Sequence, residues 1–517
     1  MGPLHIVWFK RDLRCVDHRP LLEAADCGPV LPLYVVEPEL WQQPDSSARQ
    51  WAFCRESLGE LRASLASLGQ PLIVRVGVVE QVLERARRQF GIAGLWSHEE
   101  TGNGWTYARD QRVAAWARQH AITWREIPPF GVTRRLNSRQ GWARRWEQRM
   151  AEAISPAPKR LTPLAGLDPG PIPTAEALVM AADPCPDRQA GGRSQGLAVL
   201  ESFLEQRSRT YQLGLSSPNT AGVSCSRLSP HLSWGTLSLR EVVQRTRQRR
   251  AALTAVPWRR ALQRFDERLH WHCHFIQKLE SQPSLEFREL HPLTAGLRSG
   301  EGAGDEARLA AWAEGRTGLP FVDACMRSLI ASGWLNFRMR AMLQSVASYQ
   351  LWLPWRESGL HLARLFVDYE PGIHWSQCQM QSGTTGINTI RIYNPIKQGR
   401  DHDPEGVFIR RWLPELADVP AVHLHEPWRM DGATQERSGC RLGVDYPEPI
   451  VDWVAAAATA RDRLWSLRRE QGFAATADAI QQRHGSRRSG LRASSRRSRR
   501  DLPAADASVA QLSLDLA

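Results

Sequence analysis

The chain has 517 residues, of which 42% are hydrophobic, and its formal net charge is +13 at pH 7. This length is too great for one hydrophobic core, so two or three domains are expected. The sequence contains no run of 18 apolar residues and no signal-peptide pattern, which argues against a membrane protein and a secreted protein. We therefore expect a soluble, cytoplasmic protein.

The positive charge favours a polyanionic partner such as DNA. Much of it is local, because residues 483–500, RHGSRRSGLRASSRRSRR, contain eight arginines and no acid. We interpret residues 471–517 as a basic, disordered tail. It either binds nucleic acid without sequence preference or is simply solvated.

The nine cysteines are scattered, with no CxxC pair, so spacing predicts neither disulfides nor a metal cluster. The sequence HWHCH places His270 and His274 on one helical face. No carboxylate or second motif completes a ligand set around them, and we predict no metal site.

Residues 1–130 alternate between strand and helix patterns. Alternating order of this kind is typical of a doubly wound parallel sheet, although no GxGxxG follows the first strand. Helical patterns cover 48–69 and 79–91. The predicted buried strands are residues 5–9, 30–36, 71–77 and 94–99.

The second half of the chain is predicted to be helical. Residues 131–195 are rich in proline and glycine and are expected to form a connector, and residues 196–470 form an all-α domain. The helical patterns in this domain lie at 196–207, 238–250, 259–280, 320–333 and 333–352.

Two of these helices carry polar side chains with a clear geometry. Arg268, Trp271, His274 and Lys278 share one helical face, which suits stacking on a base beside phosphates but is equally typical of a solvated face. Arg338 and Arg340 point about 200° apart on their helix, so they cannot share one ligand.

If one of these two arginines is buried, it needs an acid as its partner. Asp368 and Glu370 are the candidates. They begin the stretch 368–386, DYEPGIHWSQCQMQSGTTG, which has neither helical nor strand periodicity and is expected to line a site. Residues 224–235, SCSRLSPHLSWG, place small hydroxyl side chains at a helix start. That pattern suits a phosphate, although simple helix capping explains it as well.

Four segments in this order resemble the cryptochrome/photolyase flavoproteins over residues 4–470. They are VWFKRDLR (7–14), SCSRLSPHLSWG (224–235), GLPFVDACMRSLIASGWLNFRMRAM (318–342) and RIYNPIKQGRDHDPEGVFIRRWLPEL (391–416). The resemblance implies an α/β antenna domain, a long connector and a helical domain that binds FAD. It also implies that residues 368–386 line the flavin ring.

The resemblance also implies roles for individual residues. Arg340 and Asp368 would form a buried ion pair against the flavin, with Glu370 beside them. Trp271, Arg338 and Met380 would border the cavity that receives a flipped lesion. The phosphate region would be held by Tyr211, Cys225 (a threonine in the family), Ser226, Leu228 and Ser229.

Several positions depart from the family pattern. His374 replaces an asparagine that faces flavin N5, Cys378 and Met380 replace two tryptophans, and Arg268 replaces a glutamate that binds the dimer. Phe337 replaces an asparagine near the flavin.

The tryptophan chain that reduces the flavin under light is affected by these changes. Cys378 occupies its first position. Trp355 retains the second, and the third falls near Gly302. We interpret the chain as broken or rerouted through Trp375.

The leading hypothesis is light-driven repair of cyclobutane pyrimidine dimers in UV-damaged DNA by a monomer that holds FAD. The alternatives are a cryptochrome-type blue-light photoreceptor without repair activity and a (6-4) photolyase, in which His274 or His374 would be the acid. The domain for an antenna pigment, folate or deazaflavin, is present, but no specific motif for either pigment is found.

Overall fold

The computed structural model describes residues 4–298 and 304–485, and its first domain is built on a parallel sheet. The strand order is β3-β2-β1-β4-β5, and every pairing is parallel. The predicted α/β class is therefore confirmed. The strands are β1 (His5–Phe9), β2 (Val30–Val36), β3 (Ile73–Val76), β4 (Gly94–His98) and β5 (Thr123–Ile127).

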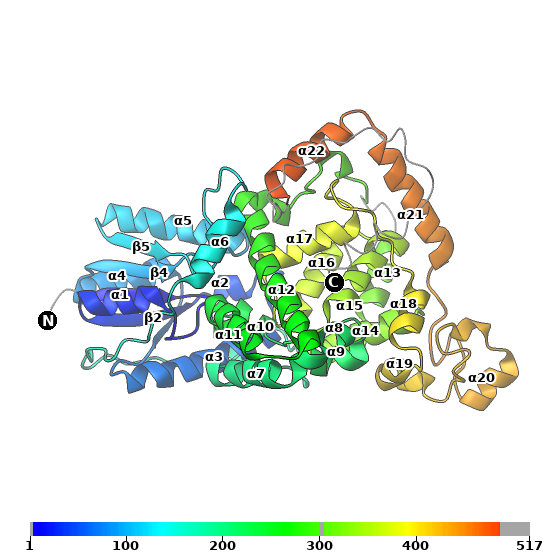
Figure 1. Ribbon diagram of the computed structural model, residues 1–517, viewed down its shortest axis with the longest axis horizontal. Helices are drawn as coiled ribbons and strands as arrows, with labels where there is room; N and C mark the ends of the chain where they lie inside the picture. Colours follow the sequence, from blue (N-terminus) through cyan, green and yellow to red (C-terminus); the bar gives the residue numbers. More distant parts are fainter. Residues whose placement is uncertain (1–3, 299–303, 486–517) are drawn as a thin grey trace.

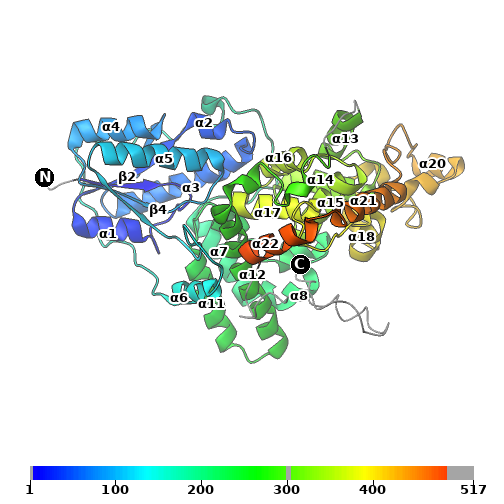
Figure 2. The same ribbon diagram turned by 90° about the horizontal axis from the view of Figure 1, so that it is seen from above.

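Helices cover both faces of this sheet, and as a result nearly every residue of β1, β2 and β4 is buried. α1 (Arg19–Cys27) and α3 (Ala48–Ser67) pack on the face that carries Val7 and Phe9. α4 (Val79–Phe90) and α5 (Gly104–Gln119) pack on the face that carries Ile6 and Trp8. Figure 2 shows these two layers on either side of the strands. The short α2 (Pro38–Trp41) follows β2.

The described residues from 196 to 470 are mostly helical, as predicted, and lie to the right of the sheet in Figure 1. The connector between the domains contains one helix of its own, α6, which packs on α11. The helices from the connector onward are α6 (Trp142–Ala151), α7 (Arg193–Glu205), α8 (Tyr211–Gly214), α9 (Pro218–Ser224), α10 (Ser229–Ser233), α11 (Leu239–Ala252), α12 (Val256–Ser281), α13 (Gly304–Ala313), α14 (Pro320–Ser332), α15 (Phe337–Ser345), α16 (Trp355–Leu365), α17 (Pro371–Ser382), α18 (Pro395–His402), α19 (Val407–Trp412), α20 (Gly432–Ser438), α21 (Trp453–Arg468) and α22 (Phe473–His484).

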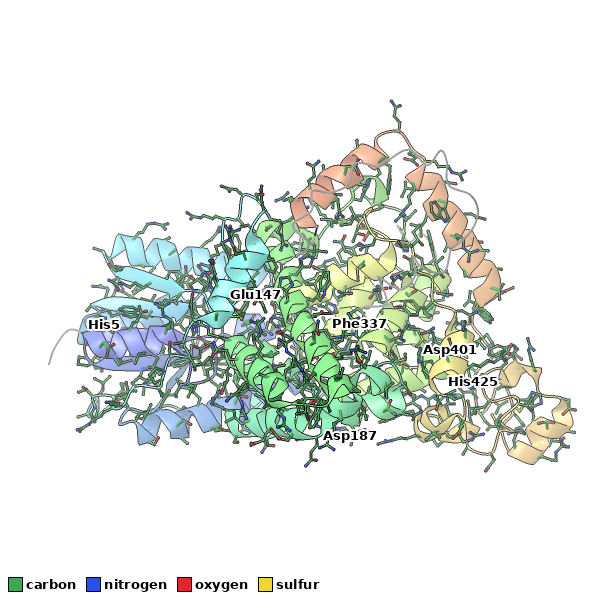
Figure 3. The ribbon with its side chains drawn as sticks, viewed as in Figure 1. His5, Glu147, Asp187, Phe337, Asp401 and His425 are labelled. Atoms are coloured by element: carbon green, nitrogen blue, oxygen red, sulfur yellow. The ribbon has the colours of Figure 1, made fainter. Side chains whose placement is uncertain are left out.

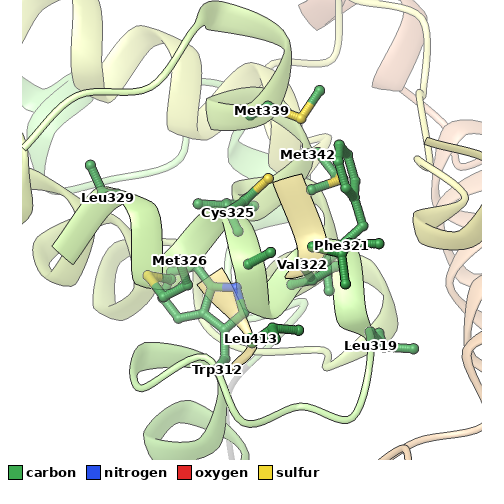
Figure 4. Close-up of a cluster of buried hydrophobic side chains, with 14 of the residues drawn as sticks. Trp312, Leu319, Phe321, Val322, Cys325, Met326, Leu329, Met339, Met342 and Leu413 are labelled. Carbon is green, nitrogen blue, oxygen red and sulfur yellow. The ribbon is translucent and has the colours of Figure 1, made fainter. Parts of the chain in front are cut away.

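The largest core of the helical domain forms around α14, α15 and α19 (Figure 4). Trp312, Met326 and Leu413 are fully buried in it. α15 continues into a π-helical turn, Val346–Gln350, a feature that is frequent near functional sites. This core fixes α15 in position, and α15 forms part of the cavity described below.

α12 and α17 cross closely beside this core. A Cβ atom added at Gly372, in the first turn of α17, would lie 2.6 Å from the Cα atom of Ile276 on α12. Glycine is therefore required for the two helices to approach this closely.

Side chains of α3 and of the loop after α2 join the two domains. Arg49 is 3% exposed, and its Nη1 donates to the carbonyl oxygen of Ile330 at 3.0 Å while its Nε donates to Asp183 at 2.8 Å. The Tyr369 hydroxyl donates to the Asp45 carboxylate at 2.7 Å. These buried bonds fix the sheet against the helical domain.

One predicted boundary differs from the helices observed. The segment from residue 471, expected to be disordered, begins with α22. The arginine-rich run from residue 487 lies outside the described residues, as does Gly302. None of the helices in the described ranges combines the length and apolar character that crossing a membrane requires.

Candidate functional site: a cavity between two helices

A cavity of about 880 Å³ opens between α12, α15 and α17. Its volume lies near the upper end of the range for ligand pockets, about 300 to 1,000 Å³. Residues of α12, α15 and α17 line its walls, and residues in and just before α10 and at the end of α22 also line it. Figure 3 shows Phe337, which lines the cavity, inside the helical domain.

The face of α12 predicted from spacing lines this cavity. Arg268, Trp271, His274 and Lys278 all contribute. His274 and Lys278 are only 3% and 6% exposed, so a solvated face is ruled out for them. The Arg268 guanidinium lies 5.9 Å from the ring of Tyr211. The other histidine of HWHCH, His270, packs against the rings of Trp142 and Trp146 instead.

The stretch 368–386 is mostly helix, which its sequence did not predict. α17 turns Ile373, Gln377, Met380 and Gln381 toward the cavity, a spacing of four, three and one residues that belongs to one helical face. Sequence reasoning found Met380 but missed the two glutamines. The pattern was present in IHWSQCQMQ, but it was obscured because the opposite face of α17 is buried and also partly polar.

His374 is not among the residues that line the cavity, and its place opposite flavin N5 stays a prediction. Its ring lies between those of Tyr369 and Trp375, and its Nε2 lies 2.8 Å from the carbonyl oxygen of Gly359. Burial lowers the pKa of His374 to about 4, so the ring is neutral at pH 7. A neutral, fully packed imidazole is a structural element of the α16–α17 contact.

Arg340 and Asp368 form the ion pair that the family resemblance implied. Two parallel bonds join them, Nη1 to Oδ1 at 2.9 Å and Nη2 to Oδ2 at 2.7 Å, and the Asp368 side chain is 2% exposed. Arg338 points elsewhere and lines the cavity. Asp368 also lines the cavity, so the pair holds a carboxylate at its wall.

The charged partner of Glu370 is Arg11, whereas the sequence suggested Arg338 or Arg340. Glu370 lines the cavity and lies 3.8 Å from Arg11, a residue of the first domain. Burial raises the pKa of Glu370 to about 7, and the attraction of Arg11 only partly offsets this. Its charge is therefore sensitive to pH near neutrality.

The predicted phosphate-binding residues divide into two groups. Ser226 and Ser229 line the cavity, whereas Tyr211 and Leu228 are buried in the core beside it. Burial raises the pKa of the Cys225 thiol to about 11, so it is neutral at pH 7. The hydroxyl groups of the two serines are therefore the groups that this stretch presents to a ligand.

A second polar cluster, which the sequence did not predict, lies at the carboxyl ends of β1 and β4. Asp12 accepts from His18 Nε2 at 2.9 Å and from His98 Nδ1 at 2.7 Å. The three groups lie within 4.8 Å of one another, close enough for a metal ion. His18 Nδ1 accepts from the Leu21 backbone, which places the proton on Nε2. Hydrogen bonding thus accounts for the whole cluster.

Comparison with known proteins identifies the family. The model described as the FAD binding domain of DNA photolyase matches residues 265–466, and the DNA photolyase model matches residues 5–128. Cryptochrome DASH of Gloeobacter violaceus is 31% identical over 484 residues, which cover 88% of this chain and 94% of that protein. The chain belongs to the photolyase and cryptochrome family.

Other members of the family agree with this assignment. Deoxyribodipyrimidine photo-lyase of Streptomyces griseus is 30% identical over 88% of this chain and 97% of its own length. The crystal structure of a bacterial class III photolyase from Agrobacterium tumefaciens superposes with a TM-score of 0.79 at 25% identity, covering 91% of this chain and 98% of that one.

FAD is the cofactor that the helical domain of this family binds, and the residues present fit it. Three side chains that line the cavity carry buried polar atoms without a hydrogen-bond partner among the described residues. They are Nε1 of Trp271, Nε of Arg338 and both amide atoms of Gln377. A ligand rich in nitrogen and oxygen atoms, such as an isoalloxazine ring, can satisfy such groups.

The family's chain of tryptophans is altered here. Trp355 is 4% exposed, its ring centroid lies 5.9 Å from that of Trp375, and its Nε1 donates to Glu289 at 3.1 Å. Trp375 in turn donates to the Tyr369 hydroxyl at 3.1 Å. Cys378 belongs to α17 but does not line the cavity, and its Sγ lies 3.4 Å from His374 Nε2. A ring pair therefore exists, but neither tryptophan lines the cavity.

A second, smaller cavity lies at the carboxyl ends of β1 and β2. Its volume is about 70 Å³, and Trp8, Tyr34 and Trp41 are among the residues that line it. Ligand pockets are several times larger, about 300 Å³ or more.

Proposed function

We propose that this protein repairs cyclobutane pyrimidine dimers in DNA under blue light. The observation that carries the proposal is the cavity of about 880 Å³, which combines the Trp271 ring, the Arg338 guanidinium and the Asp368 carboxylate around one space. Relatives named deoxyribodipyrimidine photo-lyase support it. The proposal implies that the substrate is UV-damaged DNA.

The side chains of the cavity have three tasks in this proposal. Basic residues around the opening bind the phosphates of the damaged strand. A pyrimidine dimer stacks poorly in the duplex, so its extrusion into the cavity costs less than that of an ordinary base. Trp271 and Met380 offer flat and polarizable contact surfaces for the extruded rings.

When bound, reduced FAD would supply the chemistry, an electron that is donated under light to split the cyclobutane ring and is then returned. The protein contributes position and environment. Arg340 holds Asp368 in one orientation at the cavity wall, and the apolar side chains of Phe337, Ile373 and Met380 exclude water. No side chain acts as a nucleophile.

A blue-light photoreceptor without repair activity is the second candidate. The observation in its favour is Arg268, which lines the cavity where the family has a glutamate that binds the dimer. Relatives named cryptochrome also support it. Repair of (6-4) lesions needs an acidic histidine. Burial lowers the pKa of His274 well below its usual value, so His274 is a poor proton donor at pH 7.

The test is light-dependent repair by full-length protein loaded with chemically reduced FAD. The substrate is an oligonucleotide that contains one thymine dimer, and the signal is the recovery of intact thymines relative to a dark sample. A parallel sample contains a (6-4) lesion. Repair of the dimer alone supports the proposal, repair of the (6-4) lesion alone contradicts it, and no repair by FAD-loaded protein favours the photoreceptor.

A further inference from the structure

The α22 end of the cavity carries basic side chains that are buried together. Arg139, His274, Lys278 and His484 are 4%, 3%, 6% and 0% exposed. They come from three segments far apart in the sequence: the connector, α12 and α22. His274, Lys278 and His484 line the cavity. α22 lies beyond residue 466, where the match to the FAD-binding family model ends.

Several nitrogen atoms of this group have no hydrogen-bond acceptor in the described part of the chain. They include Nε and Nη1 of Arg139 and Nδ1 of His484. The remaining bonds are few. Arg139 Nη2 donates to the carbonyl oxygen of His274 at 3.2 Å, and His484 Nε2 lies 2.8 Å from Oε1 of Gln282. Buried cationic groups without partners are costly, which points to a ligand that supplies the acceptors.

Arg139 and Lys278 are the cations of this group, because burial lowers the pKa of His484 to about 3 and the pKa of His274 well below its usual value, which leaves both rings neutral at pH 7. Within residues 4–298 and 304–485, no carboxylate forms an ion pair with any of the four. Burial, and then the charge of Arg139, lower the pKa of Lys278 to about 8. The nearest favourable contact of the ammonium group is the Phe275 ring, 5.1 Å away. A bound anion would attract both Lys278 and Arg139 and so offset the repulsion between these two cations.

This group is separate from the serines that face the other end of the cavity. Both ends are marked on α12: the Arg268 guanidinium lies 5.9 Å from the ring of Tyr211, which shares a core with Leu228 of the serine stretch, and His484 bonds Gln282 at the other end of the helix. Fourteen residues of helix span about 21 Å. Figure 1 shows α8 and α10 near one end of α12 and α22 near the other. The flavin pyrophosphate expected at the serines therefore leaves the basic end for another anion.

We propose that Arg139, His274, Lys278 and His484 form a binding site for a phosphate group at the α22 end of the cavity. Arginine and lysine form strong charge-assisted hydrogen bonds with phosphate oxygens. The phosphate belongs either to the DNA strand beside the extruded lesion or to free phosphate. The DNA source rests on the proposed function, and the free-phosphate source does not.

The test compares full-length, FAD-loaded wild-type protein with two variants, Lys278→Met and His484→Gln. Lys159→Met is the matched control, because Lys159 is exposed in the connector and its loss changes the net charge equally. One probe is inorganic phosphate, measured by calorimetry. The other is a single-stranded oligonucleotide with one thymine dimer, in which each backbone phosphate near the lesion is replaced in turn by a neutral methylphosphonate.

We expect both variants to weaken phosphate-group binding about 10-fold to 100-fold, the usual effect of losing a buried charge-assisted bond. For DNA as the source, one methylphosphonate position weakens wild-type binding and leaves Lys278→Met unaffected. For free phosphate as the source, inorganic phosphate binding is lost in the variants and oligonucleotide affinity is unchanged. The proposal is wrong if both variants bind both probes as Lys159→Met does.

Two further readouts separate this result from misfolding and from failure of the proposed function. Removing an unpaired buried charge should raise the Tm of ligand-free Lys278→Met above that of wild type, so the variant is expected to fold. Lys278→Arg should retain most of the affinity. If wild type repairs no lesion but binds phosphate and loses it in Lys278→Met, the proposed function fails while this site stands.

Discussion

Asp368 is the residue on which the cavity wall most depends. Arg340→Gln would leave its carboxylate, 2% exposed, without a charged partner. Breaking a buried pair from one side costs about 3 to 5 kcal/mol, so we expect the free energy of unfolding to fall by about 3 kcal/mol, with loss of bound FAD. Urea titration and flavin absorbance measure both effects.

The control for this variant is Arg19→Gln. Arg19 and Glu23 also form an ion pair, but their side chains are 48% and 35% exposed. Exposed pairs contribute less than about 1 kcal/mol. An equal loss of stability in both variants would contradict the importance given to burial of Asp368.

Glu370 is expected to make stability depend on pH. Its pKa in the folded protein, about 7, lies above the ordinary value of 4.5, so between these values the folded state binds more protons than the unfolded state. The free energy of unfolding must then fall as pH rises from 5 to 7, by at most about 1.4 kcal/mol per pH unit from this group. Glu370→Gln should remove this part of the decline, as denaturant titrations at pH 5 and pH 7 would show. An equal decline in wild type and in Glu370→Gln would contradict this role of Glu370.

At the scale of elements, α16 and α17 together hold the Trp355–Trp375 ring pair, through which the sequence predicts a rerouted path to the flavin. If electrons reach the flavin through Trp375 and Trp355, Trp375→Phe should slow photoreduction of oxidised FAD about tenfold, equivalent to about 1.4 kcal/mol of barrier. The measurement is bleaching of flavin absorbance under blue light with an external thiol. Trp465→Phe, at a half-exposed position on α21, is the control. Equal rates in the two variants would exclude this route.

The elements that sequence reasoning missed share a physical cause. β5 is an edge strand whose residues are at most half-buried, so it lacks the apolar run that revealed the other four strands. α17 is enclosed on nearly all sides, and buried glutamines and serines replace its expected periodicity. Residues such as Arg139 and His484 belong to no motif, and only the tertiary fold brings them to α12. In contrast, helix geometry showed that Arg338 and Arg340 cannot share one ligand, and the family resemblance then implied the Arg340–Asp368 pair.

At the scale of the whole molecule, Arg49 joins the two domains. Its guanidinium bonds with Asp183 and with the carbonyl oxygens of Ile330 and Leu365. Arg49→Met leaves those buried acceptors without a donor, and we expect it to lower the free energy of unfolding by about 3 kcal/mol. The urea transition should also separate into two steps, one for each domain.

Tryptophan fluorescence and far-UV circular dichroism would follow the two steps separately. Arg85→Met, at an exposed position of α4, is the control and should change stability by less than about 0.5 kcal/mol. A single unshifted transition for Arg49→Met would mean that other contacts hold the domains together.

The contact between Gly372 and Ile276 has a consequence for how the protein selects its substrate. These residues set the spacing of α12 and α17, yet neither lines the cavity. The contact fixes how closely the two helices approach at that crossing, and a larger residue at position 372 would push them apart. In the proposed repair reaction, selection by size would then depend on the DNA: a lesion would be admitted when it can leave the helix in a shape that fits this spacing.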